Sequence, residues 1–185
     1  MSQATQPLLD ELVGNAHGNL VRVREILDEH PELLNEKATW NETPIQAATQ
    51  MGNRKIIDEL ISRGAPVDFF TALALGRKEL IEDELKRNPA AAQARGIHDL
   101  APLYFAAIGA QRDAAQRLIA AGAEVNATAQ AGAPIHGAVM GGEVEMVRLL
   151  LDHGADPSLR DYAGRDARSL ALEIKRQDIA EMLGG

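Results

Sequence analysis

The chain has 185 residues and no cysteine, which excludes disulfides, a thiolate nucleophile and a thiolate metal site. Its 19 basic and 27 acidic residues give a net charge of −8, so a nucleic-acid backbone is not expected as a partner. Residues 1–7 lack the basic and apolar segments of a signal peptide, and no apolar run approaches the roughly 18 residues of a membrane span. These features predict a cytoplasmic protein that is not inserted in a membrane.

Pairs of apolar segments with helical spacing recur along the chain. The first segment of each pair begins near residues 11, 45, 69, 103, 135 and 168. A turn follows, and then a longer helix with apolar residues on one side and charged residues on the other, as at Met146, Val147 and Leu150. The predicted repeats, each a helix, a turn, a longer helix and a loop, make one domain over 1–185 and span 8–41, 42–68, 69–98, 99–130, 131–160 and 161–185.

Proline and glycine mark the ends of three of these repeats. A Thr-Pro or Ala-Pro step precedes a Gly-Ala step, and the proline lies 20 residues before the glycine each time: Pro44 and Gly64, Pro102 and Gly122, Pro134 and Gly154. Proline is tolerated in the first turn of a helix, and glycine supplies a left-handed cap at its end. A period near 33 residues predicts an all-α solenoid, in which each repeat buries its apolar side on its neighbours.

One step between repeats is shorter than the rest. The second and third repeats begin 24 residues apart, whereas the other steps are 32 to 34 residues. Because the flanking helices have ordinary lengths, the loop near residue 68 is predicted to be almost absent. Phe69 is then expected in the core, and Phe70 is expected to line a notch that divides the binding face.

The fifth repeat carries the most specific motif. Pro134-Ile135-His136-Gly137-Ala138, Gly142, the run 147–151 and Gly154-Ala155-Asp156 resemble the ankyrin-repeat family, and the resemblance extends over about residues 11–183. It implies an ankyrin-repeat solenoid of five to six helix–turn–helix units with short hairpin loops. It also implies a scaffold for protein–protein interaction, whose partner docks on a concave face of hairpin fingertips and first helices. In the family, the histidine at position 136 ties neighbouring repeats by hydrogen bonds.

The resemblance also implies which positions contact the partner. By register these are fingertip and first-helix residues, namely Trp40, Glu42, Met51, Leu75, His98, Leu100, Ile108, Gln130, Met140, Tyr162 and Arg165. Several are large and apolar, and a stripe of such residues on a surface marks an interface. Tryptophan, tyrosine and arginine are the types that dominate interface energetics. The alternative interpretation is that Trp40 and Tyr162 fold back to shield adjacent repeats.

The sequence shows no constellation for catalysis, cofactor binding or metal binding. The five histidines are scattered, and none has a histidine or carboxylate four residues away. Phosphate-loop and nucleophile-elbow motifs are absent. We therefore expect a non-enzymatic monomer that uses no cofactor and binds a protein. The abundance of alanine and arginine favours a bacterial source. Two alternatives stay open: a small-molecule binder or enzyme that uses a notch near Phe70, and a self-associating structural module.

Overall fold

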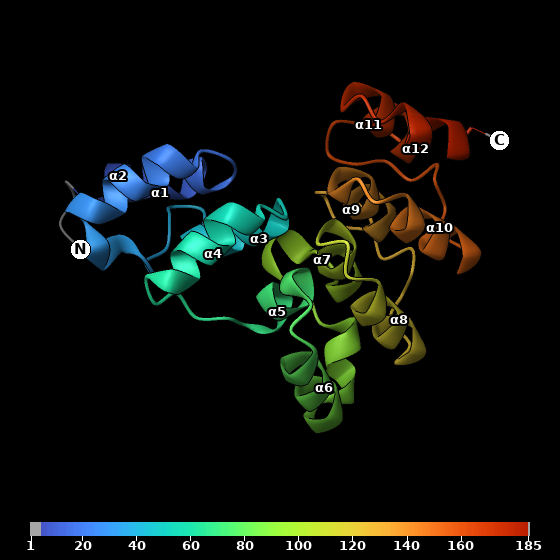
Figure 1. Ribbon diagram of the computed structural model, residues 1–185, viewed down its shortest axis with the longest axis horizontal. Helices are drawn as coiled ribbons and strands as arrows, with labels where there is room; N and C mark the ends of the chain where they lie inside the picture. The colour runs from blue at the N-terminus through green and yellow to red at the C-terminus, as the bar shows by residue number, and fades with distance from the viewer. Residues whose placement is uncertain (1–4, 185) are drawn as a thin grey trace. The chain divides into compact units, whose positions relative to one another are not determined.

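Figure 1 shows the computed structural model of the chain, which describes residues 5–184. Within this range the regular elements are helices, with a single isolated β-bridge between Ala129 and Gly132. The all-α fold predicted from the sequence is confirmed. The chain divides after Thr71 into two parts, here called the N-terminal unit (residues 5–71) and the C-terminal unit (residues 72–184).

The N-terminal unit consists of two helix pairs. They are α1 (Gln6–Ala16) with α2 (Leu20–Glu29), and α3 (Pro44–Gln50) with α4 (Arg54–Ser62). A 3-10 turn, η1 (Pro31–Leu33), follows α2. Helix α1 packs on both α2 and α3, and α2 packs on α4. The core of this unit is aliphatic, with fully buried side chains that include Leu9, Leu12, Val23, Ile56 and Leu60.

The C-terminal unit continues the same pattern. Helix α5 (Phe69–Leu75) crosses the division between the units and precedes α6 (Lys78–Arg87). Three further pairs follow, which are α7 (Pro102–Ile108) with α8 (Arg112–Ala120), α9 (Pro134–Gly141) with α10 (Val144–Asp152), and α11 (Ala167–Glu173) with α12 (Gln177–Met182). First helices pack on one another in order, α7 on α9 and α9 on α11 (Figure 1).

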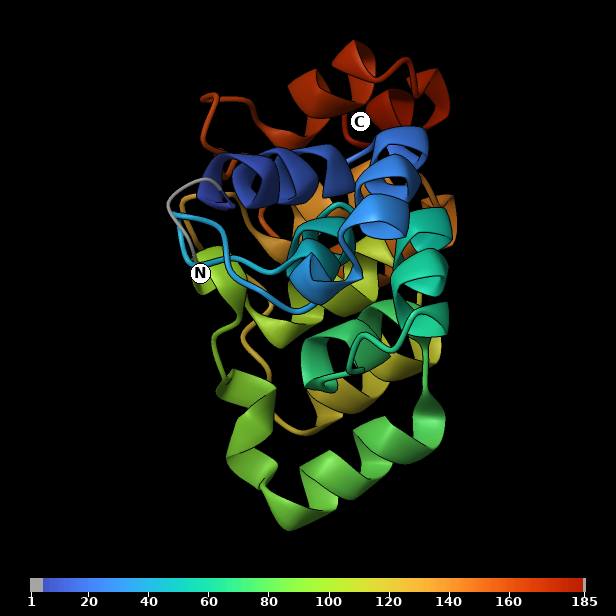
Figure 2. The same ribbon diagram turned by 90° about the vertical axis from the view of Figure 1, so that its left-hand side faces the viewer.

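Two short 3-10 segments separate α6 from α7. The first, η2 (Pro89–Gln93), lies alongside α6, as Figure 2 also shows. The second, η3 (Ile97–Asp99), is a tight turn in which His98 and Asp99 have φ of 53° and 61°. Such positive φ values are unusual for residues with a side chain and belong to turns rather than to a helix.

The predicted helix starts are confirmed at their prolines. Pro44, Pro102 and Pro134 are the first residues of α3, α7 and α9. At α3 the preceding residue, Thr43, adds a reciprocal cap. The backbone N–H of Gln46 donates to Thr43 Oγ1 (3.4 Å), and the backbone N–H of Thr43 donates to Gln46 Oε1 (3.0 Å). This capping box satisfies two backbone donors at the helix end.

The turns inside the helix pairs share one left-handed residue. It occurs at the same register position in five pairs, at Gly52, Gly76, Ala110, Gly142 and Lys175, with φ between 56° and 70°. The glycine at the equivalent position of the first pair, Gly18, is not left-handed. The sequence register therefore places this turn correctly in every pair after the first.

The shortened loop is also confirmed. Only residues 63–68 connect α4 to α5, whereas residues 121–133 connect α8 to α9. Phe69, which the sequence predicts to be a core residue, is only half-buried. Its ring packs edge-on against Phe70, with centroids 5.8 Å apart.

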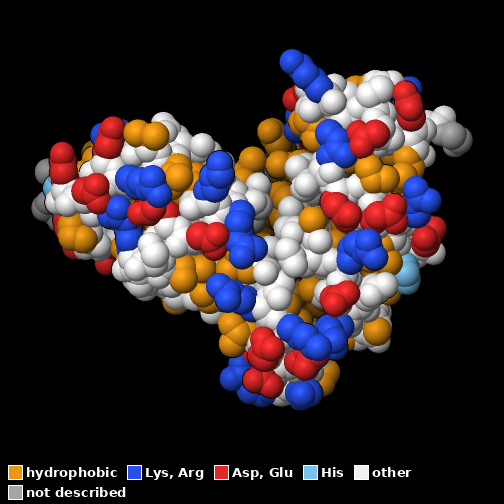
Figure 3. Space-filling view, viewed as in Figure 1, with side chains coloured by type: hydrophobic (Ala, Val, Ile, Leu, Met, Phe, Trp, Pro, Cys, Tyr) orange, Lys and Arg blue, Asp and Glu red, His pale blue; other side chains and the backbone are white. Residues whose placement is uncertain are grey.

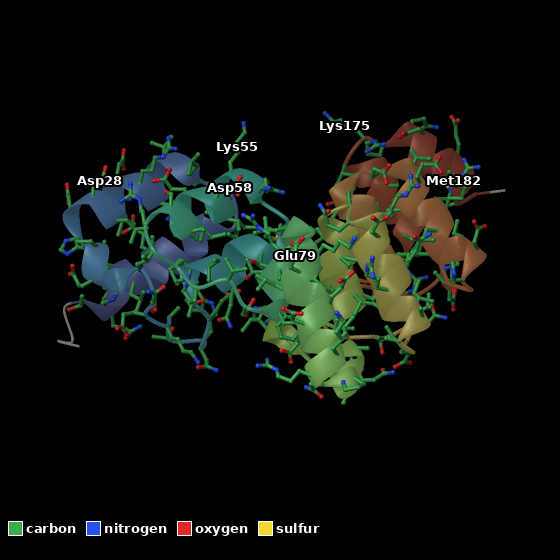
Figure 4. All side chains as sticks on the ribbon, turned by 60° about the horizontal axis from the view of Figure 1, so that its bottom comes forward. Asp28, Lys55, Asp58, Glu79, Lys175 and Met182 are labelled. Atoms are coloured by element: carbon green, nitrogen blue, oxygen red, sulfur yellow. The ribbon has the colours of Figure 1, made fainter. Side chains whose placement is uncertain are left out.

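Charged side chains cover the outer sides of the second helices. Ion pairs link neighbouring second helices, as between Arg24 and Glu59 (2.6 Å) and between Arg117 and Glu82 (2.9 Å). Acidic and basic side chains are interspersed on the face drawn in Figure 3. Lys55 and Lys175 extend away from the ribbons in Figure 4, and both are exposed.

Glycines allow the first helices of the C-terminal unit to touch through their backbones. A Cβ atom at Gly109 would lie 2.1 Å from the carbonyl oxygen of Ala74, and one at Gly141 would lie 2.6 Å from that of Ile108. Gly14 in α1 differs, because a Cβ there would have no neighbour within 4 Å. A small residue is therefore required at Gly109 and Gly141 but not at Gly14.

This difference predicts opposite effects of the same substitution. Gly141→Ala should lower the free energy of unfolding by about 1–3 kcal/mol, because the helices must move apart. Gly14→Ala should raise it by roughly 0.5–1 kcal/mol, because alanine favours an exposed helix interior. Urea unfolding followed by far-UV circular dichroism measures both. Equal effects at the two positions would contradict the close contact at Gly141.

A second prediction concerns the core. Leu150 on α10 is fully buried, so Leu150→Ala should cost about 2–5 kcal/mol of unfolding free energy. Leu80 on α6 is half-exposed, so the matched substitution Leu80→Ala should change that free energy by about 0.5 kcal/mol or less. The same urea experiment compares them, and a larger loss at Leu80 would show that the packing is assigned incorrectly.

Candidate binding surface

The loop before α3, here called the N-terminal finger (residues 37–43), is folded back on itself and fixed to α1. The Ala38 N–H donates to the carbonyl of Glu42 (2.9 Å), and the Asn41 N–H donates to that of Ala38 (2.8 Å). Asp10 on α1 accepts hydrogen bonds from the N–H of Thr39 (2.9 Å) and from its hydroxyl (3.0 Å). These hydrogen bonds, with that from Gln6, lower the pKa of Asp10. The finger is thus held by a charged helix residue.

The Trp40 ring projects from this finger in a defined orientation. It is 42% exposed, and its Nε1–H donates to Glu42 Oε2 at 2.7 Å. The Glu42 side chain is buried. A hydrogen bond to an ionised acceptor is stronger than one between neutral groups, so the indole is anchored while its face stays accessible. Met51, directly after α3, is also exposed (39%).

Two further polar side chains complete the anchor of Trp40. Gln50 at the end of α3 donates from Nε2 to Glu42 Oε1 (2.9 Å), and the same nitrogen lies 2.7 Å from His17 Nε2. His17, just after α1, lies 3.8 Å from Glu42 Oε2. The sequence alone did not indicate this role of His17. The two side chains come from neighbouring register positions of successive repeats, because His17 lies one residue before Gly18 and Gln50 lies two residues before the equivalent Gly52.

The loop before α11, here called the C-terminal finger (residues 160–166), is anchored by an ion pair between Asp161 and Arg165. Asp161 is buried and accepts from the N–H groups of Ala163 and Arg165 (both 2.9 Å). The Arg165 guanidinium lies 2.7 Å from the other Asp161 oxygen and 2.6 Å from Glu173 Oε1. It also lies 5.5 Å from the centroid of the Tyr162 ring, which is 74% exposed. The arginine therefore supports an accessible aromatic ring by a cation–π contact.

His136 joins this finger to the neighbouring repeat. The buried His136 accepts the Ala133 N–H at Nδ1 (3.1 Å), so Nε2 carries the proton and donates to the carbonyl of Arg165 (3.1 Å). This is the inter-repeat tie that the motif implied. Nearby, the Tyr104 hydroxyl donates to Met140 Sδ (3.8 Å). Burial raises the pKa of Tyr104, so its phenol stays neutral.

The predicted apolar stripe is not continuously exposed. Four of the predicted contact residues have buried side chains, namely Glu42, Leu75, Leu100 and Ile108. Leu100 and Ile108 are only 1% and 4% exposed. The remaining predicted positions reach the surface fully or in part, and they are Trp40, Met51, His98, Gln130, Met140, Tyr162 and Arg165. The accessible residues therefore gather at the fingers and helix ends.

The comparisons with known proteins identify the family. The sequence model described as "Ankyrin repeats (3 copies)" matches residues 103–184, which contain α7 to α12. The chain is an ankyrin-repeat protein. Ankyrin repeats are generally protein–protein interaction modules, and the family is typically non-enzymatic.

Several curated relatives share parts of this ankyrin-repeat chain. It is 30% identical over 141 residues (76% of the chain) to human BCL-6 corepressor-like protein 1. It is 44% identical over 50 residues (27% of the chain) to zygote-specific protein 3 of Chlamydomonas reinhardtii, and 48% identical over 60 residues (32%) to an ankyrin repeat and LEM domain-containing protein 1 homolog of Caenorhabditis elegans. The matched segments make up only 8%, 13% and 8% of these relatives. All three are eukaryotic, so the bacterial source stays a prediction.

None of the helices in residues 5–184 is both long and apolar enough to cross a membrane. The same residues contain no group of three or more histidine or carboxylate side chains arranged to hold a metal ion.

The ion pair between Asp161 and Arg165 should make the stability of the C-terminal finger depend on pH. Burial opposes ionisation of Asp161, but the hydrogen bonds from the Arg165 side chain and from backbone N–H groups outweigh it, so its pKa is lowered. The resulting stability is complete above the ordinary aspartate value of about 3.9 and is lost as the pH falls through the folded pKa. Arg165→Gln should raise the pKa of Asp161 and cost about 1–3 kcal/mol of unfolding free energy at neutral pH, a difference that shrinks in acid.

Carboxyl-carbon NMR titration and urea unfolding at several pH values measure these two effects. Arg148→Gln is the matched control, because Arg148 pairs with Glu145 at 3.8 Å on the exposed surface, where such pairs contribute about 0–1 kcal/mol. If both substitutions cost the same at every pH, the buried pair does not stabilise the finger as described.

Proposed function

We propose that this ankyrin-repeat chain binds a protein partner through its fingers and the adjoining ends of its first helices, the surface that forms the concave face in the family. The observation that carries the proposal is the Trp40 ring, which is partly exposed yet fixed by the hydrogen bond to buried Glu42. Ordering a surface side chain costs about 0.5–1.5 kcal/mol on binding. A ring that is already ordered avoids much of that cost.

The residue types at both fingers support this proposal. Trp40, Tyr162 and Arg165 belong to the three classes most often found as interface hot spots. Met51 is exposed and Met140 is partly exposed, and methionine adapts to apolar partner surfaces. We infer a partner that offers apolar pockets for the rings and polar groups around them. The name of the human relative describes a corepressor-like protein, and we propose that protein binding is what the shared segment contributes.

The remaining features of the proposal are a monomer that uses no cofactor, works in the cytoplasm, and binds neither nucleic acid nor a membrane. The net charge of −8 supports the exclusion of nucleic acid. We place the alternative of a small-molecule or catalytic notch near Phe70 behind protein binding, because the Leu75 side chain at the end of the same helix is buried. Self-association through the exposed rings remains as the second candidate, since an exposed aromatic can equally contact a second copy.

The binding proposal predicts a loss of affinity from two substitutions. Trp40→Ala and Tyr162→Ala should each weaken partner binding by about 2 kcal/mol, or about 30-fold in Kd, as expected of hot spots. The immobilised chain captures proteins from an extract of its host, and quantitative mass spectrometry then compares the variants. A purified candidate is titrated against each variant by calorimetry.

Val21→Ala is the matched control, because Val21 on α2 is 67% exposed but lies outside the fingers. Variants are compared only where their unfolding free energies agree. If Trp40→Ala and Tyr162→Ala capture the same proteins in the same amounts as the wild type, the proposal is wrong. Size-exclusion chromatography with light scattering tests self-association, and a dimer that Trp40→Ala dissociates would favour the second candidate.

A further inference from the structure

The anchor of Trp40 includes a histidine that has no part in the binding surface itself. Trp40 Nε1 and Gln50 Nε2 donate to the two oxygens of Glu42, at 2.7 and 2.9 Å, and Gln50 Nε2 lies 2.7 Å from His17 Nε2. We propose that protonation of His17 loosens the hydrogen bond between Trp40 and Glu42, so that the N-terminal finger responds to pH. Histidine is the side chain whose charge ordinarily changes between about pH 5 and 8.

The hydrogen-bond chain assigns the protonation state of His17 in the structure. A carboxylate oxygen can only accept, so the Gln50 amide must present its nitrogen, not its oxygen, to Glu42. The same nitrogen then donates to His17 Nε2, which must therefore carry a lone pair. The proton of the neutral ring is on Nδ1, which lies 3.2 Å from the carbonyl oxygen of Gly14. The arrangement thus requires neutral imidazole.

Protonation makes this arrangement impossible. Both nitrogens of an imidazolium are donors, so the new Nε2–H would face the Gln50 amide donor at 2.7 Å. An acceptor lies within reach at Glu42 Oε2, 3.8 Å from Nε2. That oxygen already accepts the Trp40 Nε1–H. Because the imidazolium adds a charge–charge attraction that the neutral indole lacks, the carboxylate turns toward His17 and the indole bond lengthens.

Glu42 is the carboxylate that lies beside a charged His17 ring. Among residues 5–184, Glu42 is the acidic group within ion-pair distance of the ring. On the helices beside it, Glu11 of α1 is paired with Arg22 of α2 (2.6 Å), and Gln50 of α3 is neutral. The ring belongs to the residue directly after α1. The outcome is an exchange of partners at Glu42 rather than expulsion of the imidazolium.

The consequence for binding rests on the proposed function of Trp40. With its hydrogen bond loosened, the ring samples more orientations and loses its pre-organisation, so a partner should bind more weakly in mild acid. The loosening itself requires no partner and is measured directly.

The test uses the one tryptophan of the chain, which gives a single indole N–H signal in a 15N-labelled sample. Between about pH 8 and 5 the wild-type indole signal should shift upfield with the midpoint of the His17 ring. Protection of that proton from solvent exchange, relative to a free indole at the same pH, should fall by roughly tenfold. In His17→Gln, which stays neutral and retains an acceptor, neither change should occur.

His153→Gln is the matched control. His153 also follows a helix, with Nδ1 2.8 Å from the carbonyl oxygen of Leu149, but in the described part of the chain it has no acidic side chain within ion-pair distance. This variant should behave like the wild type.

Three outcomes overturn the inference. The first is a sigmoidal shift of the indole signal that persists in His17→Gln, and the second is a stationary wild-type signal while the His17 ring titrates. The third needs no variant: a His17 ring that carries its neutral proton on Nε2 contradicts the assigned hydrogen bonds. If the indole responds to pH but Trp40→Ala leaves partner capture unchanged, the pH response stands and the binding role of Trp40 fails.

Discussion

Direct contact between the backbones of successive first helices is the constraint on which the C-terminal unit depends. Gly109 lies against the carbonyl of Ala74, and Gly141 against that of Ile108, with no side chain between them. This short separation lets apolar residues of adjacent repeats fill one continuous core. It also brings the loops before successive first helices to the same edge of the stack, and the exposed functional candidates lie in these loops and at helix ends. Each repeat contacts its nearest neighbours, so the stability is approximately a sum over the repeats and the interfaces between them.

Each finger orients an exposed aromatic ring through a charged residue, and the residue at the equivalent position is acidic in one finger and basic in the other. Glu42 and Arg165 occupy equivalent positions, each directly before the residue that caps the following first helix, Thr43 or Asp166. In one finger a buried glutamate accepts from the indole, and in the other a buried aspartate holds the arginine that supports the Tyr162 ring. Every buried polar side-chain atom in the described part of the chain has a hydrogen-bond partner. Satisfied networks of this kind are rigid, so both aromatic rings are presented in defined orientations.

Such networks also determine where the surface is sensitive to change. A buried carboxylate can exchange its donors but cannot lose them without a cost, because an unpaired buried charge is expensive. Glu42 connects α3, the finger and the histidine after α1, so a change in the charge of one member is transmitted to the exposed ring. Asp161 has no histidine within ion-pair distance in the described residues, and its partner arginine stays charged at all accessible pH values. The two fingers should therefore differ in their response to acid.

The sequence by itself determined the features that depend on local sterics and periodicity. Pro44, Pro102 and Pro134 begin helices because proline suits only the first turn, and the short connection 63–68 follows from the spacing of the repeats. Tertiary structure decided which register positions are accessible. Leu100 and Ile108 lie on the predicted face but are covered, and Glu42 and His17 are brought together from different repeats. A register places a side chain on one side of a helix, but its exposure depends on how closely the next helix approaches, and that distance is set by packing across repeats.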